Sequence, residues 1–100
     1  MANFQHLEIL RQGVEIWNQW RLDEQKSVLT IDWHDLNLCE ANLTAVNLEG
    51  ANLREADLSE ANLERADFRE ANLAKTSLIA TQALETNFQK VILTGACIED

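Results

Sequence analysis

Apolar residues recur every five positions along most of this chain. One block, IDWHD, begins at Ile31, and thirteen more follow from Leu36 without an insertion: LNLCE, ANLTA, VNLEG, ANLRE, ADLSE, ANLER, ADFRE, ANLAK, TSLIA, TQALE, TNFQK, VILTG and ACIED. Each block is centred on a large apolar residue. A small residue usually stands two positions before the centre, and Asn or Asp usually stands directly before it. The period of five therefore governs residues 31–100.

A period of five fits neither regular secondary structure. In an α-helix, five residues turn the side chain by about 500°, so the leucines would scatter around the helix axis. In a straight strand the side-chain period is two, so successive leucines would point to opposite faces. The backbone must therefore bend once per block. Four bends of about 90° close a square coil of twenty residues, and such coils would stack at about 4.8 Å.

This coil places residues that are twenty positions apart in one column of a solid core. The predicted core consists of the block centres Trp33, Leu38, Leu43, Leu48, Leu53, Leu58, Leu63, Phe68, Leu73, Leu78, Phe88, Leu93 and Ile98. Phe68 and Phe88 share a column, where two bulky residues in adjacent layers are most easily accommodated. The Asn and Asp side chains are short enough to hydrogen-bond the backbone at each turn.

The run ANLREADLSEANLERADFREANL resembles the pentapeptide-repeat proteins, whose consensus is A(D/N)LXX. The resemblance covers residues 31–100 and implies a mainly β fold, a right-handed quadrilateral β-helix of about three and a half coils. Its handedness is implied by the resemblance alone. The repeats depart from the consensus near the end, where less regular coils are expected: Ala83 is a weak centre, and Asn or Asp is replaced at Ser77, Gln82, Ile92 and Cys97.

Residues 1–30 show a helical period instead. Apolar residues recur there at spacings of three and four: Phe4, Leu7, Leu10, Val14 and Trp17. The spacing predicts one amphipathic helix over roughly residues 4–24, followed by a connector at residues 25–30. Gly13 would weaken this helix by about 1 kcal/mol relative to Ala. We expect the helix to cap the first coil, because an open coil end exposes backbone groups and core leucines.

Two interpretations are open for the tryptophans Trp17, Trp20 and Trp33. They could form a binding cluster, or they could seal the end of the leucine core, which is the more common role of large buried aromatics. We expect the sealing role. The segment GVEIWNQW followed by an acidic repeat array also resembles cyanobacterial members of the family.

The charge is concentrated in the repeats. Residues 1–30 carry four acids and three bases, while residues 31–100 carry thirteen acids and five bases, a net charge of −8. Acidic surfaces disfavour direct binding to nucleic acid and to anionic membranes. The N-terminus has no basic leader, and no apolar run approaches the roughly 18 residues that span a bilayer. We therefore expect a cytoplasmic protein that binds neither nucleic acid nor membrane.

Residues suited to catalysis are few. Cys39 follows His34 by one block, but a corner separates them and no third residue is evident to orient the histidine. Cys39 and Cys97 would lie about three coils apart, beyond the Cα separation of about 7 Å that a disulfide allows. The chain lacks a Gly-rich phosphate loop and the paired Cys or His spacing of metal sites. We expect a non-enzyme without cofactor or metal; catalysis by Cys39 or paired carboxylates is the alternative.

Two outward surfaces are candidates for binding a protein partner, which the sequence does not identify. One is acidic and contains Glu40, Asp57 and Glu60; the other is apolar and contains Ile79, Leu84 and Ile92. Local irregularity that buries some of the apolar residues is the alternative for the second surface. The chain stops in VILTGACIED without a cap for its last coil. Because open edges invite pairing, we also expect a homodimer through the C-terminal coils.

The expected function is therefore that of a non-enzymatic protein-interaction or scaffold module. The alternative is an acidic DNA mimic that binds DNA gyrase or another DNA-binding protein, since some members of the family that protect gyrase from quinolones resemble duplex DNA in charge and shape. Length is against this alternative, because three and a half coils at β spacing extend only about 17 Å.

Overall fold

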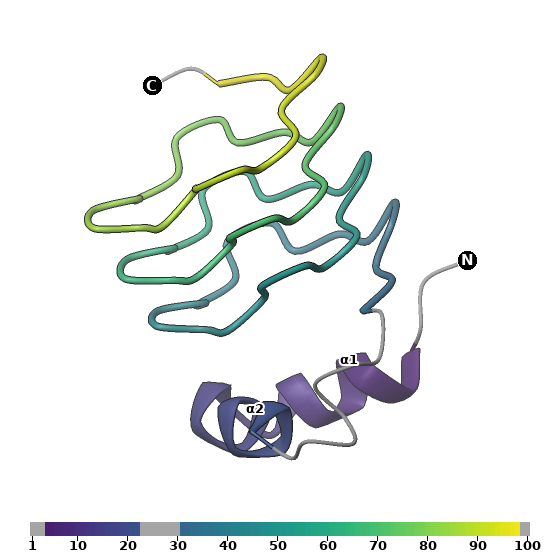
Figure 1. Cartoon of the computed structure of the whole chain (residues 1–100), viewed down its shortest axis with the longest axis vertical. Helices are drawn as coiled ribbons and strands as arrows, with labels where there is room; N and C mark the ends of the chain where they lie inside the picture. The colour runs from purple at the N-terminus through teal and green to yellow at the C-terminus, as the bar shows by residue number, and fades with distance from the viewer. Residues whose placement is uncertain (1–3, 23–30, 99–100) are drawn as a thin grey trace.

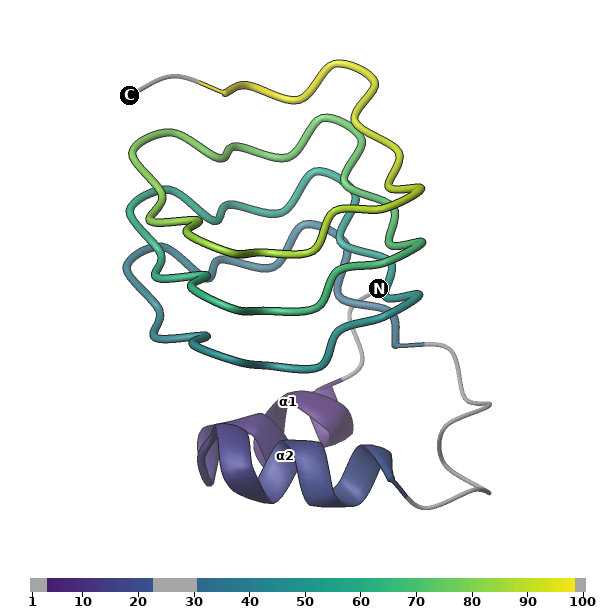
Figure 2. The same cartoon turned by 60° about the vertical axis from the view of Figure 1, so that its left-hand side comes forward.

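The computed structural model describes residues 4–22 and 31–98 of the chain. Two short helices, α1 (Phe4–Arg11) and α2 (Val14–Arg21), precede a solenoid of stacked coils. Both helices lie beneath the first coil, and the coils rise from there to the C-terminal end (Figures 1 and 2). The molecule is therefore a stack of coils with a helical cap at one end.

The coils are held together by a regular pattern of backbone hydrogen bonds. Parallel bridges join residues twenty positions apart, from Asp32 and Asn52 at one end to Ser77 and Cys97 at the other. Within each bridge a lower amide donates upward and an upper amide donates downward, as in Leu43 N to Asn62 O at 2.8 Å and Asn62 N to Ala41 O at 2.9 Å. The twenty-residue coil predicted from the sequence is thus confirmed.

Each corner of the square is a β-turn that begins at a block centre. The amide of Leu36 donates to the carbonyl oxygen of Trp33 at 3.1 Å, and the same bond recurs along the solenoid. The third residue of each turn has a positive φ, between 58° and 66° at eleven non-glycine positions from Asp35 to Lys90. For residues other than Gly this left-handed conformation costs about 1–2 kcal/mol of free energy, so the stacked layers must hold the backbone in it.

The Asn and Asp residues stabilise these turns through their side chains. The Oδ1 atom of Asn37 accepts a hydrogen bond from the amide of Cys39 at 2.9 Å, and Asp57 accepts one from Ser59 at the same distance. Equivalent bonds form at the other described Asn and Asp positions before a block centre. The predicted role of Asn and Asp is therefore confirmed.

The core prediction is right for most of the solenoid and wrong at its C-terminal end. Ten of the predicted core residues, from Trp33 to Leu78, are buried. Phe88 is only half-buried, while Leu93 and Ile98 are 38% and 62% exposed. These last residues occupy core columns, but no further coil is stacked on them within residues 31–98. Their exposure follows from that open end.

The single helix predicted for residues 4–24 is also wrong. The backbone breaks at Gly13, whose φ of 119° and ψ of 156° are not helical, and the two helices on either side have eight residues each. The break allows both helices to pack on the first coil, and Leu7, Leu10 and Trp17 are buried there. Val14 is partly buried against the same cluster. The packing predicted for Phe4 and the connector at residues 25–30 lie outside the described part of the chain.

The cap seals the core as predicted and also bonds part of the backbone edge of the first coil. Trp17 packs on Trp33 with tilted rings whose centroids are 5.1 Å apart, and both side chains are fully buried. The three polar groups that block 46–50 directs toward the cap are each bonded by α2. Trp17 Nε1 donates to Asn47 O at 2.7 Å, Asn47 N donates to Asn18 Oδ1 at 2.8 Å, and Arg21 Nη2 donates to Glu49 O at 2.6 Å.

Candidate interaction surfaces

Four side chains form what we call the acidic face: Cys39, Glu40, Asp57 and Glu60. Glu40 and Glu60 occupy equivalent corners of adjacent layers, with φ of 66° and 62°. The Cys39 sulfur and one carboxylate oxygen from each glutamate all lie within 4.8 Å of one another, and these three residues are exposed. Among the described residues, neither Glu40 nor Glu60 forms an ion pair within 4.0 Å. The acidic residues predicted as a surface are thus brought together and left unneutralised.

The surroundings of the acidic face change the pKa of the Cys39 thiol. Loss of hydration raises the pKa of Cys39, and the negative charges of Asp57, Glu40 and Glu60 raise it further. Cys39, Glu40 and Glu60 offer three ligand atoms to a cation. However, a metal binds the thiolate, and the raised pKa disfavours that form. Cys39 and Cys97 are both free thiols, as predicted.

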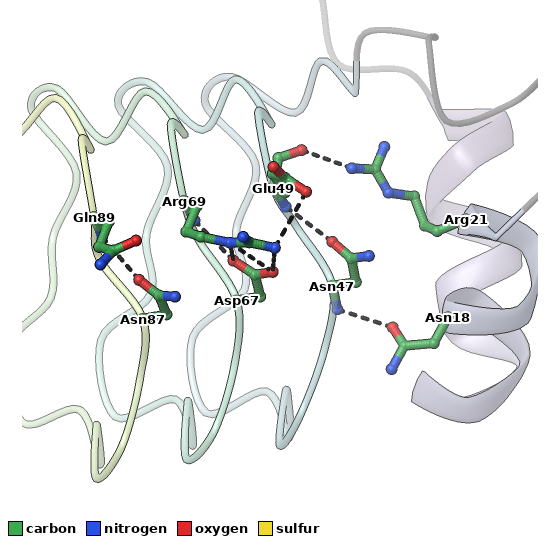
Figure 3. A network of polar contacts seen from close by, with 8 residues as sticks. All are labelled: Asn18, Arg21, Asn47, Glu49, Asp67, Arg69, Asn87 and Gln89. Atoms are coloured by element: carbon green, nitrogen blue, oxygen red, sulfur yellow. Dashed lines mark hydrogen bonds and ion pairs between the residues drawn. The ribbon is translucent and has the colours of Figure 1, made fainter. Parts of the chain in front are cut away.

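A second face shows the opposite arrangement, in which a base neutralises the acids (Figure 3). Arg69 donates to the Asp67 carboxylate through Nε at 3.0 Å and Nη2 at 2.8 Å, and its Nη2 lies 3.5 Å from Glu49 Oε1. The hydrogen bonds from Arg69 lower the pKa of Asp67. This internal pairing distinguishes the face of Asp67 from the acidic face.

The three apolar candidates are exposed but lie on different faces of the square. Ile79 is 36% exposed in block 76–80, Leu84 is 66% exposed in block 81–85, and Ile92 is 49% exposed in block 91–95. Blocks 76–80 and 81–85 are on adjacent sides, and block 91–95 stacks on block 71–75. The three side chains therefore surround the C-terminal coils and do not gather on one side.

The C-terminal end of the core is hollowed and apolar. A depression of about 160 Å³ is lined by Leu78, Thr81, Ala83, Phe88, Leu93 and Ile98. Phe88 stacks on Phe68 beneath it, with ring centroids 5.8 Å apart. The sequence predicted an open edge here, but the exposed core side chains could only be located once the layers were assigned.

A groove between the cap and the first coil was not predicted. It has a volume of about 660 Å³, and its lining includes Leu7, Leu10, Gly13 and Val14 from the cap and Leu38 and Leu43 from the coil. The groove lies where α1 passes into α2, so it depends on the helix break at Gly13. The helix predicted from the sequence is continuous and has no break at Gly13, so this groove could not be predicted from it.

The sequence also missed the residue that orients His34. The Nδ1 atom of His34 lies 2.7 Å from Asp32 Oδ1, and the hydrogen bond lowers the pKa of Asp32. In the described parts of the chain, no thiol or hydroxyl is hydrogen-bonded to His34. The histidine is therefore paired with a carboxylate and is not engaged with Cys39.

Neither α1 nor α2 is long and apolar enough to cross a membrane.

The chain matches the model of a known protein family. The family described as "Pentapeptide repeats" matches residues 32–59 and 66–100, in eight copies. No curated protein sequence matches the chain.

Solved structures give a second, independent comparison. The chain is similar to the crystal structure of a pentapeptide repeat protein, Rfr23, from the cyanobacterium Cyanothece 51142, with 29% identity and a TM-score of 0.66. The similarity covers 69% of this chain and 50% of that one, so the chain spans about half the length of Rfr23. Both comparisons support a right-handed β-helix.

Proposed function

The chain belongs to the pentapeptide-repeat family, and on that premise we propose that it is a cytoplasmic, non-enzymatic protein-interaction module. Members of the family are repeat proteins whose solid core leaves the outer faces as the surfaces for contact. In this chain the acidic face is the surface proposed to bind. Its partner would be a protein with a basic surface.

The observation that supports this proposal is the unpaired stack of Glu40 and Glu60. Arg69 neutralises Asp67 and Glu49 on a neighbouring face, whereas no described base lies within 4.0 Å of either stacked glutamate. Like charges held at adjacent corners repel each other, and a lysine or arginine from a partner would relieve that repulsion. The corner backbone fixes the spacing, so a partner would meet a preorganised pair of carboxylates.

Affinity capture from native lysate, with and without the acidic face, tests the proposal. The test variant carries Glu40→Gln, Asp57→Asn and Glu60→Gln; Asn at position 57 keeps the oxygen that accepts the Ser59 amide. The control carries Glu15→Gln, Glu70→Gln and Glu85→Gln, which change the net charge equally on other exposed surfaces. We expect a protein with a basic surface to be retained by wild type and control and lost by the test variant. Equal retention by all three would contradict the proposal.

The acidic DNA mimic is the alternative, and the net charge of −8 in residues 31–100 favours it. A mimic would present acids along the solenoid, but Arg69 neutralises part of that charge on the face of Asp67. A gyrase supercoiling assay separates the two functions. Inhibition or protection by wild type, lost in the test variant, would favour the mimic.

A further inference from the structure

The cap bonds the backbone edge of the first coil along block 46–50 and leaves it unbonded along blocks 36–40 and 41–45. Each block of the solenoid directs three backbone groups toward the layer below: the amide and carbonyl at the Asn or Asp position, and the carbonyl two residues later. In block 46–50, α2 bonds all three. In the two preceding blocks, six such groups have no hydrogen-bond partner among the described residues: the amides and carbonyls of Asn37 and Asn42, and the carbonyls of Cys39 and Thr44.

The groove between the cap and the first coil lies along these unbonded groups. Asn37, Asn42 and Thr44 line its coil side. Asn37 and Asn42 are exposed, whereas Asp57 and Asn62, in the same columns one layer higher, are only partly exposed. The groove volume of about 660 Å³ is within the range of about 300–1,000 Å³ that is typical of ligand pockets. An unpaired strand edge and an apolar hollow therefore occur together.

We propose that this groove binds an extended segment of a partner protein, which adds one parallel strand beneath block 41–45. An unpaired edge is a template for strand addition, in which main-chain hydrogen bonds hold the incoming segment. The coils themselves supply the register, because Asn62 donates to Ala41 O at 2.9 Å and accepts from Leu43 N at 2.8 Å. A segment one layer lower would give Asn42 the same two bonds. The inference rests on the proposed interaction function and specifies how its partner docks.

This register predicts which side chains of the segment are apolar. The residues that bond Asn42 would lie beneath Ala41 and Leu43, and their side chains would point inward as those two do. Inside the groove they would meet Leu10 and Val14 of the cap. The residue between them would point outward, as Asn42 does, so its identity is not constrained. The segment therefore has the order apolar, any, apolar.

Charge complementarity adds a basic residue to this pattern. The residue that precedes the first apolar one would lie beneath Glu40, which directly precedes Ala41. Glu40 and Glu60 are stacked there without a neutralising base among the described residues. The charged residues that line the groove itself, Arg11 and Glu15, are of opposite sign. A lysine or arginine beneath Glu40 would extend the stack with the charge that it lacks.

Nuclear magnetic resonance titration of the ¹⁵N-labelled full chain with two peptides tests the proposal. The probe is the capped peptide Gly-Ser-Gly-Lys-Val-Thr-Val-Ser-Gly-Ser, and the control has Pro in place of the second Val, which removes the N–H that would donate to Asn42 O. We expect the amide resonance of Asn42 to move downfield and to saturate with a dissociation constant of about 0.1–1 mM. Gln82, in the same column two layers higher, should not respond.

The proline peptide should bind at least about tenfold more weakly than the probe, which is the loss of about 1.4 kcal/mol expected for one hydrogen bond. No saturable change at Asn42 up to about 5 mM probe overturns the proposal. Equal binding of the two peptides also overturns it, because the occupant would then not be held as a strand.

Two cap variants place the peptide in the groove. Ile16, which is 48% exposed, lines the groove, whereas Leu22, which is 71% exposed, does not. Ile16→Lys places a like charge beside the lysine of the probe and should weaken binding by at least about tenfold, while Leu22→Lys should bind like wild type. Matching circular dichroism spectra of the two variants show that both are folded. Wild-type affinity in Ile16→Lys overturns the groove as the site.

The same two variants separate this inference from the proposed function. In affinity capture, Ile16→Lys should lose the protein whose retention depends on the acidic face, and Leu22→Lys should keep it. If Ile16→Lys keeps that protein as well, the acidic face still acts as an interaction surface, and docking through the groove is overturned.

Discussion

The indole nitrogen of Trp17 donates a hydrogen bond to the backbone carbonyl oxygen of Asn47 across 2.7 Å. Between coils the equivalent carbonyl accepts from a backbone amide, as Asn62 O does from Leu43 N. A helix side chain therefore replaces a missing layer of the solenoid. Because the same indole also closes the core beneath Trp33, it links the cap to the repeats both by a hydrogen bond and by packing.

Replacing Trp17 with Phe should destabilise the protein. The substitution keeps an aromatic ring but leaves the Asn47 carbonyl without its donor, so we expect the free energy of unfolding to fall by about 1–3 kcal/mol. Urea denaturation followed by circular dichroism measures the change. Ile16→Ala, at a 48% exposed position on the same helix, is the control and should stay within about 0.5 kcal/mol of wild type. An unchanged urea midpoint for Trp17→Phe would show that the bond contributes nothing.

Gly13→Ala should also destabilise the protein, contrary to what helix propensity predicts. In a continuous helix Ala would be more stable than Gly by about 1 kcal/mol. At a φ of 119° the backbone is outside the regions open to Ala, and no atom lies within 4 Å of the added methyl group, so the loss of about 1–3 kcal/mol is conformational. Gly50→Ala, at a φ of 73°, should lose less, because Ala45 already occupies an equivalent corner. Chemical denaturation of both variants gives the comparison, and a stabilised Gly13→Ala would mean that one helix can form.

The ion pair between Asp67 and Arg69 should contribute stability that depends on pH. The hydrogen bonds from Arg69 lower the pKa of Asp67 in the folded protein, so folding is favoured while this carboxylate is ionised. The contribution is complete above the ordinary pKa of 3.8 and is lost as the pH falls through the lowered value. Asp67→Asn keeps the turn bond to the Arg69 amide but removes the charge. We expect it to be less stable than wild type at neutral pH by less than about 1 kcal/mol, because solvent screens a pair whose side chains are 42% and 26% exposed.

Urea denaturation of wild type and Asp67→Asn at pH 7 and in strong acid checks this prediction. The two proteins should differ at pH 7 and converge in acid. A difference that persists unchanged in acid would mean that the loss comes from the turn and not from the charge.

Gln82→Asn should stabilise the solenoid. Asn62, directly below Gln82, accepts the amide of Glu64 at 3.0 Å through its side chain, whereas the longer Gln side chain makes no such bond to the Leu84 amide. Asn should restore the turn bond and raise the free energy of unfolding by about 0.5–1.5 kcal/mol. Gln82→Ala is the control, since it removes the amide without adding an acceptor. A gain shared by both variants would trace to the loss of Gln and not to the new bond.

The exposed block centres near the C-terminus show where sequence prediction of the core fails. Leu93 and Ile98 have the same block position as the buried Leu53 and Leu58, and the pattern assigns all four to the core. Burial depends on a neighbour above as well as below, and the sequence period reports the column but not its end. The prediction therefore held wherever a layer lies on both sides.

The position of the acidic face could be predicted because the sequence period also assigns residues to layers. Glu40 and Glu60 are twenty residues apart, so the repeat length alone placed them in adjacent layers. The absence of a neutralising base near them, and the reach of Arg69 to Asp67 and Glu49, depend on side-chain conformations that a period does not specify.

The sequence by itself determined the coil, its twenty-residue layers, the columns of the core and the turn bonds of Asn and Asp. These follow from a period of five, which neither a helix nor a straight strand can satisfy. Tertiary structure decided the break at Gly13, the bonds from α2 to Asn47 and Glu49, and the exposure of Ile98. Each of these depends on what packs against a segment from a distant part of the chain, and local spacing carries no information about that neighbour.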